Sequence, residues 1–419
     1  MLVSLCLKQA KTAYIRPENR FQPILTNIEM ITDTLTPPAG LGFELSEDHT
    51  MIRDSIRDFV EKRVAPTVME RDEKCAFPHD IVNELAEMNM LGIYHEEKYG
   101  GAGFDTMSFA IVLEEIARWD ASLALTVASH TSLCSAHIAL AGNEDQKMKY
   151  LTQLTSGKAL GAWALTEPGS GSDASNMKTT AVRQGDHWVL NGSKIFITQG
   201  SVGSIYVVLA VTDRDKGAKG VTAFILEKGM KGFSYGPKLK KLGMNSSDTT
   251  EIYMEDVIVP AENQLGELGH GFIDTMKILD GGRIGIGAIS VGIARGAFEE
   301  SKNYAQERAQ FGRPIGQNQA IQWKIVDMGV NIDAARLLVQ RAAWLKDSGK
   351  PYTKEASMAK LFASEMCTQA CLEAIQIHGG YGYTKEYHVE RFLRDAKLLE
   401  IGEGTSEVQR MVLARQFMK

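Results

Sequence analysis

The sequence predicts an α+β protein: an N-terminal helical domain, a middle antiparallel β domain and a C-terminal helical bundle. Apolar residues recur every three or four positions before about residue 160 and again after residue 271, as in amphipathic helices. Between these segments the apolar period falls to two, as in strands. The expected parts are an N-terminal extension over 1–42, a helical domain over 43–160, a β domain over 161–270 and a helical bundle over 271–419.

Composition excludes several classes of protein. Of 419 residues, 44% are hydrophobic and 23% are charged, which is enough apolar surface for large cores and excludes a mainly disordered chain. The net charge is −6 without a basic stripe, so no nucleic-acid partner is expected. No run of 18 apolar residues predicts a membrane span. Five cysteines spread along the chain favour a reducing compartment.

The first forty residues differ from the rest. They hold several basic residues before Pro37-Pro38, but the first twenty contain only two arginines and one serine. A mitochondrial transit peptide is rich in both residue types. We therefore favour a loose N-terminal extension, or a start upstream of the true one at Met30, over a transit peptide.

The helical elements of the first domain follow from spacing. Apolar residues from Ile52 to Val64 form one helical stripe, which Pro66 is expected to stop, and a second stripe runs from Ile81 towards Gly92. A glycine-rich break precedes three further helical patterns, over about 106–119, 122–141 and 144–155.

The β domain contains an Asn191-Gly192 pair between the apolar runs 187–190 and 193–198, which predicts a hairpin with a type I′ turn. Further strands are expected over 205–211, 221–226 and 249–254. After residue 271, helical patterns over 274–309, 318–348, 353–378 and 388–400 exceed the usual helix length and indicate a bundle.

Near the C-terminus, Glu403 lies between two glycines and just before Thr405-Ser406, which are expected to cap a helix. A carboxylate there is placed to remove a proton beside a carbonyl held by a backbone N–H. On this segment alone, the pattern favours an exposed acid in a flexible turn over a catalytic carboxylate. No dinucleotide fold of the Gly-x-Gly-x-x-Gly type, no P-loop and no metal site is predicted.

Five segments in order alter that balance. They are Trp-Ala-Leu-Thr-Glu-Pro-Gly-Ser-Gly-Ser-Asp (163–173), Lys-Ile-Phe-Ile-Thr (194–198), Gln-Glu-Arg-Ala-Gln-Phe-Gly (306–312), Gln-Ile-His-Gly-Gly-Tyr-Gly-Tyr (376–383) and Glu-Gly-Thr-Ser-Glu-Val-Gln-Arg (403–410). Together they resemble the acyl-CoA dehydrogenase family over residues 43 to 419. The resemblance implies a C-terminal four-helix bundle, an FAD cofactor and a homotetramer in which FAD reaches a neighbouring subunit.

The resemblance also assigns residues to the cofactor. The flavin ring would be lined by Trp163, Leu165, Thr166 and Ser172 on one side and Phe196 and Thr198 on the other. The rest of FAD, partly in a partner subunit, would contact Arg308, Gln310, Phe311, Gln319, Gln376, Gly379, Gly380, Thr405 and Glu407. An arginine suits a diphosphate because its planar fork donates two parallel hydrogen bonds.

For the substrate, the resemblance implies that Glu403 is the catalytic base and that Ser172, Asp280, Arg283, Gly404 and Arg415 surround the acyl-CoA. Some relatives carry the base on a different helix, the one that here contains Gly281-Gly282-Arg283. This sequence has glycines and no acid at those positions, which leaves Glu403 as the candidate base. Asn245 departs from a common arginine. The implied reaction is α,β-dehydrogenation to the trans-2-enoyl-CoA: Glu403 takes the pro-R α-proton, and the β-hydride passes to flavin N5. The Glu403 N–H and an FAD ribityl hydroxyl would hold the thioester oxygen.

Electrons would pass to an electron-transfer flavoprotein, in fatty acid or branched-chain amino acid catabolism. A binding or repair protein and an acyl-CoA oxidase remain rival functions; the base argues against the first and the chain length against the second. Residues 121–138, which match the acyl pocket, contain no Lys or Arg for a second carboxylate, so we expect a short- to medium-chain monocarboxyl substrate. The expected location is the bacterial cytoplasm, or the mitochondrial matrix in a eukaryote.

Overall fold

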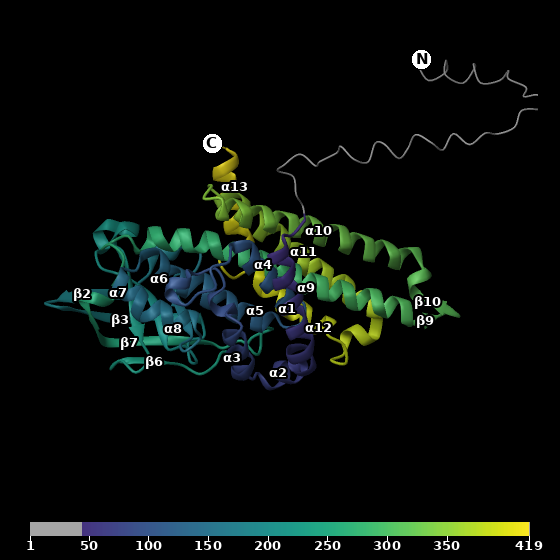
Figure 1. Cartoon of the computed structure of the whole chain (residues 1–419), viewed down its shortest axis with the longest axis horizontal. Helices are drawn as coiled ribbons and strands as arrows, with labels where there is room; N and C mark the ends of the chain where they lie inside the picture. Colours follow the sequence, from purple (N-terminus) through teal and green to yellow (C-terminus); the bar gives the residue numbers. More distant parts are fainter. Residues whose placement is uncertain (1–43, 419) are drawn as a thin grey trace, which may run out of the picture. The chain divides into compact units, whose positions relative to one another are not determined.

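The computed structural model describes residues 44–418, so the expectations for the N-terminal extension lie outside the described residues. Contacts divide the chain into the units Met1–Ser46 and Glu47–Lys419, and the second unit holds every element below. Within it, the predicted order of helical, β and helical regions is confirmed (Figure 1). The boundaries expected near residues 160 and 270 remain predictions.

The first helical region winds from residue 47 to residue 155. Its elements are α1 (Glu47–Phe59), α2 (Val68–Lys74), α3 (His79–Glu87), α4 (Thr106–Ala117), α5 (Ala121–Ala128), α6 (Ala136–Ala141), α7 (Glu144–Gln146) and α8 (Thr152–Thr155). The sequence predicts that Pro66 stops the first helix. In the structure Pro66 lies in a 3₁₀ turn (Ala65–Thr67) that leads into α2. Proline fits the first positions of such a turn because no backbone N–H is needed there.

The segment Ala121–Ala141 is continuous helix, because a π-helical stretch (Ser129–Ser135) joins α5 to α6. By length and mean hydropathy, 1.3, it is apolar enough to cross a membrane, yet 83% of that window is buried inside the protein. It is therefore placed as a core helix of this fold.

The middle region is a sheet with the strand order β6-β7-β3-β2-β4-β5-β8, and β1 pairs with β4. Its strands are β1 (Gly161–Ala164), β2 (Thr180–Gln184), β3 (His187–Thr198), β4 (Ile205–Val211), β5 (Val221–Glu227), β6 (Phe233–Tyr235), β7 (Thr249–Pro260) and β8 (Gln264–Leu265). The pairing is antiparallel except that β1 and the start of β2 run parallel to β4. Every residue of β4 is buried, which makes it the centre of the sheet.

The hairpin predicted at Asn191-Gly192 is wrong. These residues lie inside the continuous strand β3, at a break in its register with β7, and the Asn191 amide exchanges hydrogen bonds with Asp256. The turn is instead Gly185-Asp186, which joins β2 to β3, and Gly185 has the φ of 59° that such a turn requires. Asn-Gly here marks a β-bulge, and Gly192 is required because its φ is 146° and a Cβ would stand 2.5 Å from the Thr179 hydroxyl oxygen.

The C-terminal region contains α9 (Gly271–Glu307), α10 (Gln319–Asp347), α11 (Thr353–His378), α12 (Val389–Leu399) and α13 (Ser406–Phe417). A small hairpin, β9 (Ala309–Gln310) and β10 (Arg313–Pro314), follows α9 and lies at its end remote from the sheet (Figure 1). Helix α9 is the core element, since it packs against α4, α5, α10, α11 and α12. Its residues 281–294 are all buried, so it carries apolar side chains around its whole circumference.

Candidate active site

Glu403 lies in the turn between α12 and α13, with a left-handed backbone, φ 54°, followed by Gly404 at φ 91°. Thr405 is the N-cap of α13, and its hydroxyl accepts a hydrogen bond from the Val408 N–H at 3.3 Å. A left-handed conformation is costly for a residue with a Cβ and gathers at functional sites. The chain is therefore held in this turn by other contacts.

Two buried side chains supply those contacts. Lys360 of α11 donates from Nζ to the Gly404 carbonyl at 2.8 Å. Gln409 of α13 donates from Nε2 to the same carbonyl at 2.9 Å and to the Glu403 carbonyl at 3.3 Å. Both Lys360 and Gln409 are fully buried. They fix the turn, and hence the direction of the Glu403 side chain, from two different helices.

The Glu403 carboxylate lies against bare backbone of α9. A Cβ on Gly282 would stand 2.0 Å from Glu403 Oε2, so only glycine leaves room for the carboxylate at this point of the helix. Within residues 44–418, the buried Oε2 atom has no hydrogen-bond partner. Burial raises the pKa of Glu403 to about 7, against the opposing charges of Lys360 and Arg283. An unpartnered carboxylate with this pKa is suited to accept a proton near neutral pH.

Arg283 and Asp280, one turn apart on α9, are linked to α11. Arg283 donates from Nη1 to Asp280 Oδ1 at 2.5 Å and to Ser357 Oγ at 3.3 Å, and Thr353 donates to Asp280 Oδ2 at 2.5 Å. Burial raises the pKa of Asp280 and lowers the pKa of Arg283. The structure thus gathers Asp280, Arg283, Glu403 and Gly404 around the junction of α9, α11 and α13.

The residues expected around the flavin ring come from two neighbouring segments of the sheet. Ile195 donates its N–H to the Thr166 carbonyl at 2.9 Å. Lys194 is fully buried, and its Nζ donates to the Leu165 carbonyl at 3.0 Å and to Glu167 Oε1 at 2.9 Å. Phe196, which follows Ile195 along β3, has a positive φ of 60° and is 64% exposed. The bulge in β3 therefore turns a large aromatic side chain outward.

Trp163 and Leu165 are buried, whereas Thr166 and Thr198 are half-buried. Among the residues described, neither threonine hydroxyl makes a hydrogen bond, so both are available to a ligand. Trp163 donates from Nε1 to Nδ1 of His137, and Gly161 donates its N–H to Nδ1 of His130, each at 3.0 Å. Burial lowers the pKa of each histidine to about 4, so both stay neutral acceptors. These bonds attach β1 to the helix Ala121–Ala141.

A second group lies at the far end of α9. Arg308, Gln310, Gly379 and Gly380 line one cavity of about 520 Å³, together with Tyr304, His378 and Tyr381. Arg308 stands 5.5 Å from the centre of the Tyr381 ring and forms no ion pair in the part of the chain that the structure describes. Phe311, Gln319 and Gln376 are exposed nearby in sequence but do not line this cavity. The cavity offers a guanidinium without a counter-ion.

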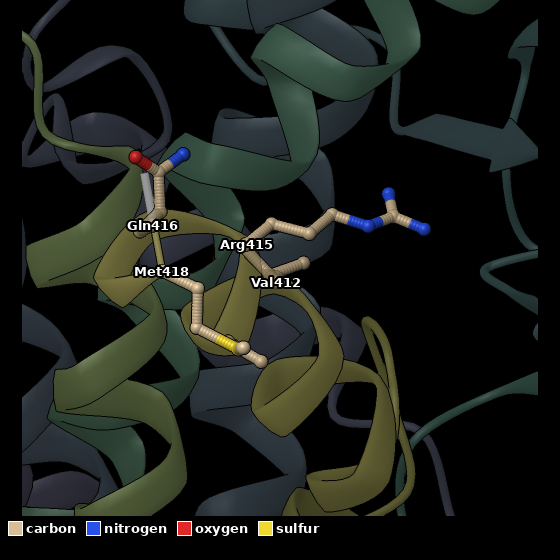
Figure 2. A pocket seen from close by; sticks show the side chains of 5 residues that line it. Val412, Arg415, Gln416 and Met418 are labelled. Atoms are coloured by element: carbon tan, nitrogen blue, oxygen red, sulfur yellow. The ribbon is translucent and has the colours of Figure 1, made fainter.

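Three further candidates are exposed: Ser172, Glu407 and Arg415. Arg415 lines a hollow of about 530 Å³ around the last turn of α13, with Val412, Ala414, Gln416 and Met418. Figure 2 shows its guanidinium extending away from Gln416 and Met418, free of the helix. The structure does not join Arg415 or Ser172 by any hydrogen bond, within residues 44–418, to the group around Glu403.

The chain matches three family models along almost all of the described range. They are acyl-CoA dehydrogenase, N-terminal domain (residues 46–158), middle domain (162–257) and C-terminal domain (269–418). The chain belongs to the acyl-CoA dehydrogenase family. This acyl-CoA dehydrogenase is therefore an FAD-dependent oxidoreductase that acts on CH–CH groups of acyl-CoA thioesters.

Individual relatives agree over most of the length. The short-chain specific acyl-CoA dehydrogenase of Clostridium acetobutylicum is 48% identical over 90% of this chain and 100% of its own. A caffeyl-CoA reductase-Etf complex subunit of Acetobacterium woodii is 46% identical over 89% and 99%. The structure of butyryl-CoA dehydrogenase from Megasphaera elsdenii superposes with a TM-score of 0.89 at 46% identity, covering 90% of this chain and 100% of that one.

The observed groups fit FAD. The free hydroxyls of Thr166 and Thr198 can bond heteroatoms of a flavin ring, and the unpaired Arg308 can bond a diphosphate. Sequence reasoning missed Lys360 and Gln409, which hold the turn at Glu403. One signal was present for Lys360: it is the lone charge on a face of α11 otherwise made of Ala356, Ala359, Ala363 and Ser364. Gln409 lay inside a quoted motif, but its side chain had no assigned task.

Proposed function

We propose that this acyl-CoA dehydrogenase oxidises a saturated, short-chain acyl-CoA to the trans-2-enoyl-CoA with Glu403 as the general base. The observation that supports this is the Glu403 carboxylate, buried without a partner against Gly282 and with its pKa raised to about 7. The relatives named for short-chain and butyryl-CoA substrates support the chain length.

Glu403 would accept the α-proton of the thioester at Oε2, the atom without a partner. The α-proton is weakly acidic in water, and burial brings the carboxylate closer to it in pKa, which makes the transfer feasible. The Glu403 N–H donates no hydrogen bond to any described residue, and it is free to hold the thioester carbonyl oxygen. FAD, when bound, supplies the acceptor for the β-hydride.

Lys360 and Gln409 would act as positioning residues. They bind the carbonyls of Glu403 and Gly404, so that the strained turn, and not a relaxed loop, carries the base. Asp280 and Arg283, which lie on either side of Gly282 in the sequence of α9, would bind the pantetheine arm. Ser172, Gly404 and Arg415 complete the proposed acyl-CoA contacts.

FAD would be held by two protomers. Arg283 lies near the base, since its charge lowers the pKa of Glu403. Arg308 comes 25 residues later, at the end of α9, which is about 37 Å from Arg283 at 1.5 Å per residue. That distance exceeds an extended dinucleotide, so the group around Arg308 would serve the FAD of a partner. The flavin-side contacts would be Trp163, Leu165, Thr166, Ser172, Phe196 and Thr198, with Thr405 and Glu407, and the partner-side contacts Arg308, Gln310, Phe311, Gln319, Gln376, Gly379 and Gly380.

An exposed apolar face supports assembly into the proposed homotetramer. Trp323, Val326, Val330, Leu337 and Trp344 follow one face of α10 and are each 46–64% exposed. Helix α10 packs on α4, α9 and α11, so this face is left uncovered by the described residues. An electron-transfer flavoprotein as electron acceptor is supported by the Etf-associated relative. The bacterial relatives support the cytoplasm as the location, whereas a mitochondrial relative from Rattus norvegicus would support the matrix in a eukaryote.

The direct test is Glu403→Gln. The amide keeps the shape of the side chain but cannot accept the proton, so FAD content should persist while bleaching of the flavin by butyryl-CoA under nitrogen slows by about 10³-fold or more. Glu365→Gln, which changes an acid paired with Arg410 at the surface, is the matched control and should bleach at the wild-type rate. Comparable bleaching by both variants would contradict the assignment of the base.

The same experiment separates rival functions. Reduced enzyme that is reoxidised rapidly by air and slowly by electron-transfer flavoprotein would indicate an acyl-CoA oxidase. A yellow protein that binds acyl-CoA without bleaching would indicate a binding role.

A further inference from the structure

A cavity of about 330 Å³ is lined by Gly281 of α9, the neighbour of the Gly282 against which the base lies. Its walls come from the loop after α3, the helix Ala121–Ala141, the π-helical stretch Lys147–Leu151, α9, the end of α10 and the loop that follows α10. The residues that matter below are Tyr94, Ser132, Ile278, Gly281, Lys346 and Tyr352.

The cavity is next to Glu403 because Gly281 and Gly282 are consecutive. A Cβ on Gly282 would meet the Glu403 carboxylate at 2.0 Å, whereas one on Gly281 would meet Lys346 Nζ at 3.4 Å and the Tyr352 hydroxyl at 3.9 Å. Two glycines within a helix cost conformational entropy, so bare backbone at this point requires a reason. At Gly282 the reason is the Glu403 carboxylate, and Gly281, the next residue on α9, lines the cavity.

The cavity contains a cation without an anion. Within residues 44–418, Lys346 Nζ makes no hydrogen bond or ion pair, and it stands 4.8 Å from the centroid of the Tyr94 ring. The adjacent Asp347 is engaged elsewhere, since its carboxylate accepts the N–H groups of Thr106 and Met107 at the start of α4. Lys277, on the same wall, is paired with Asp274.

Among the other polar groups of the cavity, the Tyr352 hydroxyl is available to donate a hydrogen bond to a ligand. The Tyr94 hydroxyl is used, because it donates to the Thr131 carbonyl at 3.0 Å. The Tyr352 hydroxyl has no hydrogen-bond partner among the described residues. The single acid on the wall, Glu96, is exposed. Apolar lining from Ala136, Ala139, Leu151 and Ile278 suits methylene groups.

We propose that this cavity receives the distal end of the acyl group, and that Lys346 and Tyr352 bind a carboxylate there. A half-buried ammonium without a counter-ion is unfavourable until an anion arrives, so a chain with a terminal carboxylate is preferred over an equally long uncharged chain. The inference rests on the proposed function, and it names the substrate class: acyl-CoA thioesters of dicarboxylic acids. The sequence search for such a cation covered residues 121–138, whereas Lys346 comes from another helix.

The test compares adipyl-CoA with hexanoyl-CoA, which have the same chain length and differ in the terminal carboxylate. In the wild-type holoenzyme we expect kcat/KM for adipyl-CoA to exceed that for hexanoyl-CoA by about tenfold or more, the factor of one good charged pair. Lys346→Met should remove this preference, and Tyr352→Phe should reduce it. Lys350→Met, which removes an exposed lysine over the Trp344 ring, is the matched control and should keep the wild-type ratio.

Binding without turnover gives a second readout. In Glu403→Gln, titration of the two thioesters should show the same preference in Kd, and the added Lys346→Met change should abolish it. If no acyl-CoA bleaches the flavin, the proposed function fails. If hexanoyl-CoA is oxidised but adipyl-CoA is not preferred, or if Lys346→Met keeps the preference, the dicarboxylate site is wrong.

Discussion

Gly282→Ala separates catalysis from stability at a single methyl group. The added Cβ would stand 2.0 Å from Glu403 Oε2, and ordinary contact begins at 3.4 Å, so the carboxylate must move by 1.4 Å. The clashing oxygen is the end of a side chain, so the carboxylate moves and the α9 backbone stays in place. Leu133 already lies 3.1 Å from the new methyl, and Lys360 and Gln409 hold the backbone on which Glu403 stands.

A displacement of about 1 Å costs about 10²-fold in rate, or roughly 2.7 kcal/mol of activation free energy. The same change favours the helix by about 0.5–1 kcal/mol, so the free energy of unfolding should stay within about 1 kcal/mol of wild type. Anaerobic bleaching with butyryl-CoA, followed in a stopped-flow instrument, measures the first quantity, and urea unfolding measures the second. Gly329→Ala on α10, where the new methyl meets Phe298 at an ordinary 3.5 Å, is the control.

A Gly282→Ala enzyme with normal FAD content and a bleaching rate within about threefold of wild type would refute the position assigned to the carboxylate. A large loss of stability without a change in rate would place Gly282 in packing alone.

Two further predictions concern the charges around the site. Since burial raises the pKa of Glu403 to about 7, kcat/KM for butyryl-CoA should rise about tenfold per pH unit below pH 7 and level off above it; Lys360→Met removes a charge that lowers this pKa and should shift the limb to higher pH. An unshifted limb would mean that another group is titrating. Arg308→Ala should weaken FAD binding by about tenfold or more, measured as FAD per subunit after dialysis, while Arg313→Ala, whose guanidinium bonds Asn318, should retain FAD. Equal retention by both variants would remove Arg308 from the cofactor site.

The fold was predictable where one physical signal dominates. The helical patterns over 318–348 and 353–378 differ by a residue at most from α10 and α11, because long amphipathic periods leave few alternatives. The hairpin failed because Asn-Gly is suited to both a type I′ turn and a bulge, and the choice between them was made by Asp256 and β7, far along the chain. The residues around Asn191 do not indicate this distant partner.

For the site, sequence identified residues that belong to motifs but not those assembled by packing. Glu403 stood out between glycines, yet its burial depends on Gly282 of a helix 121 positions earlier. Lys360 and Lys346 are lysines on long helices, where a solvated side chain is the ordinary expectation. Only the crossing of α9, α10 and α11 turns one towards the Gly404 carbonyl and the other towards the Tyr94 ring.

The two imidazole bonds to β1 have a consequence for how the enzyme responds to its substrate. His130 and His137 belong to the same helix as Ser132 and Ala136, which line the cavity beside the α9 glycines. Through Gly161 and Trp163 that helix is fastened to the strand that leads directly into Leu165 and Thr166. A chain that fills the cavity therefore acts on the same rigid element as the segment expected to hold the flavin. If a ligand at one site shifts this helix, we expect the free energy of binding at the other site to change, and thermodynamic linkage would make the effect equal in both directions.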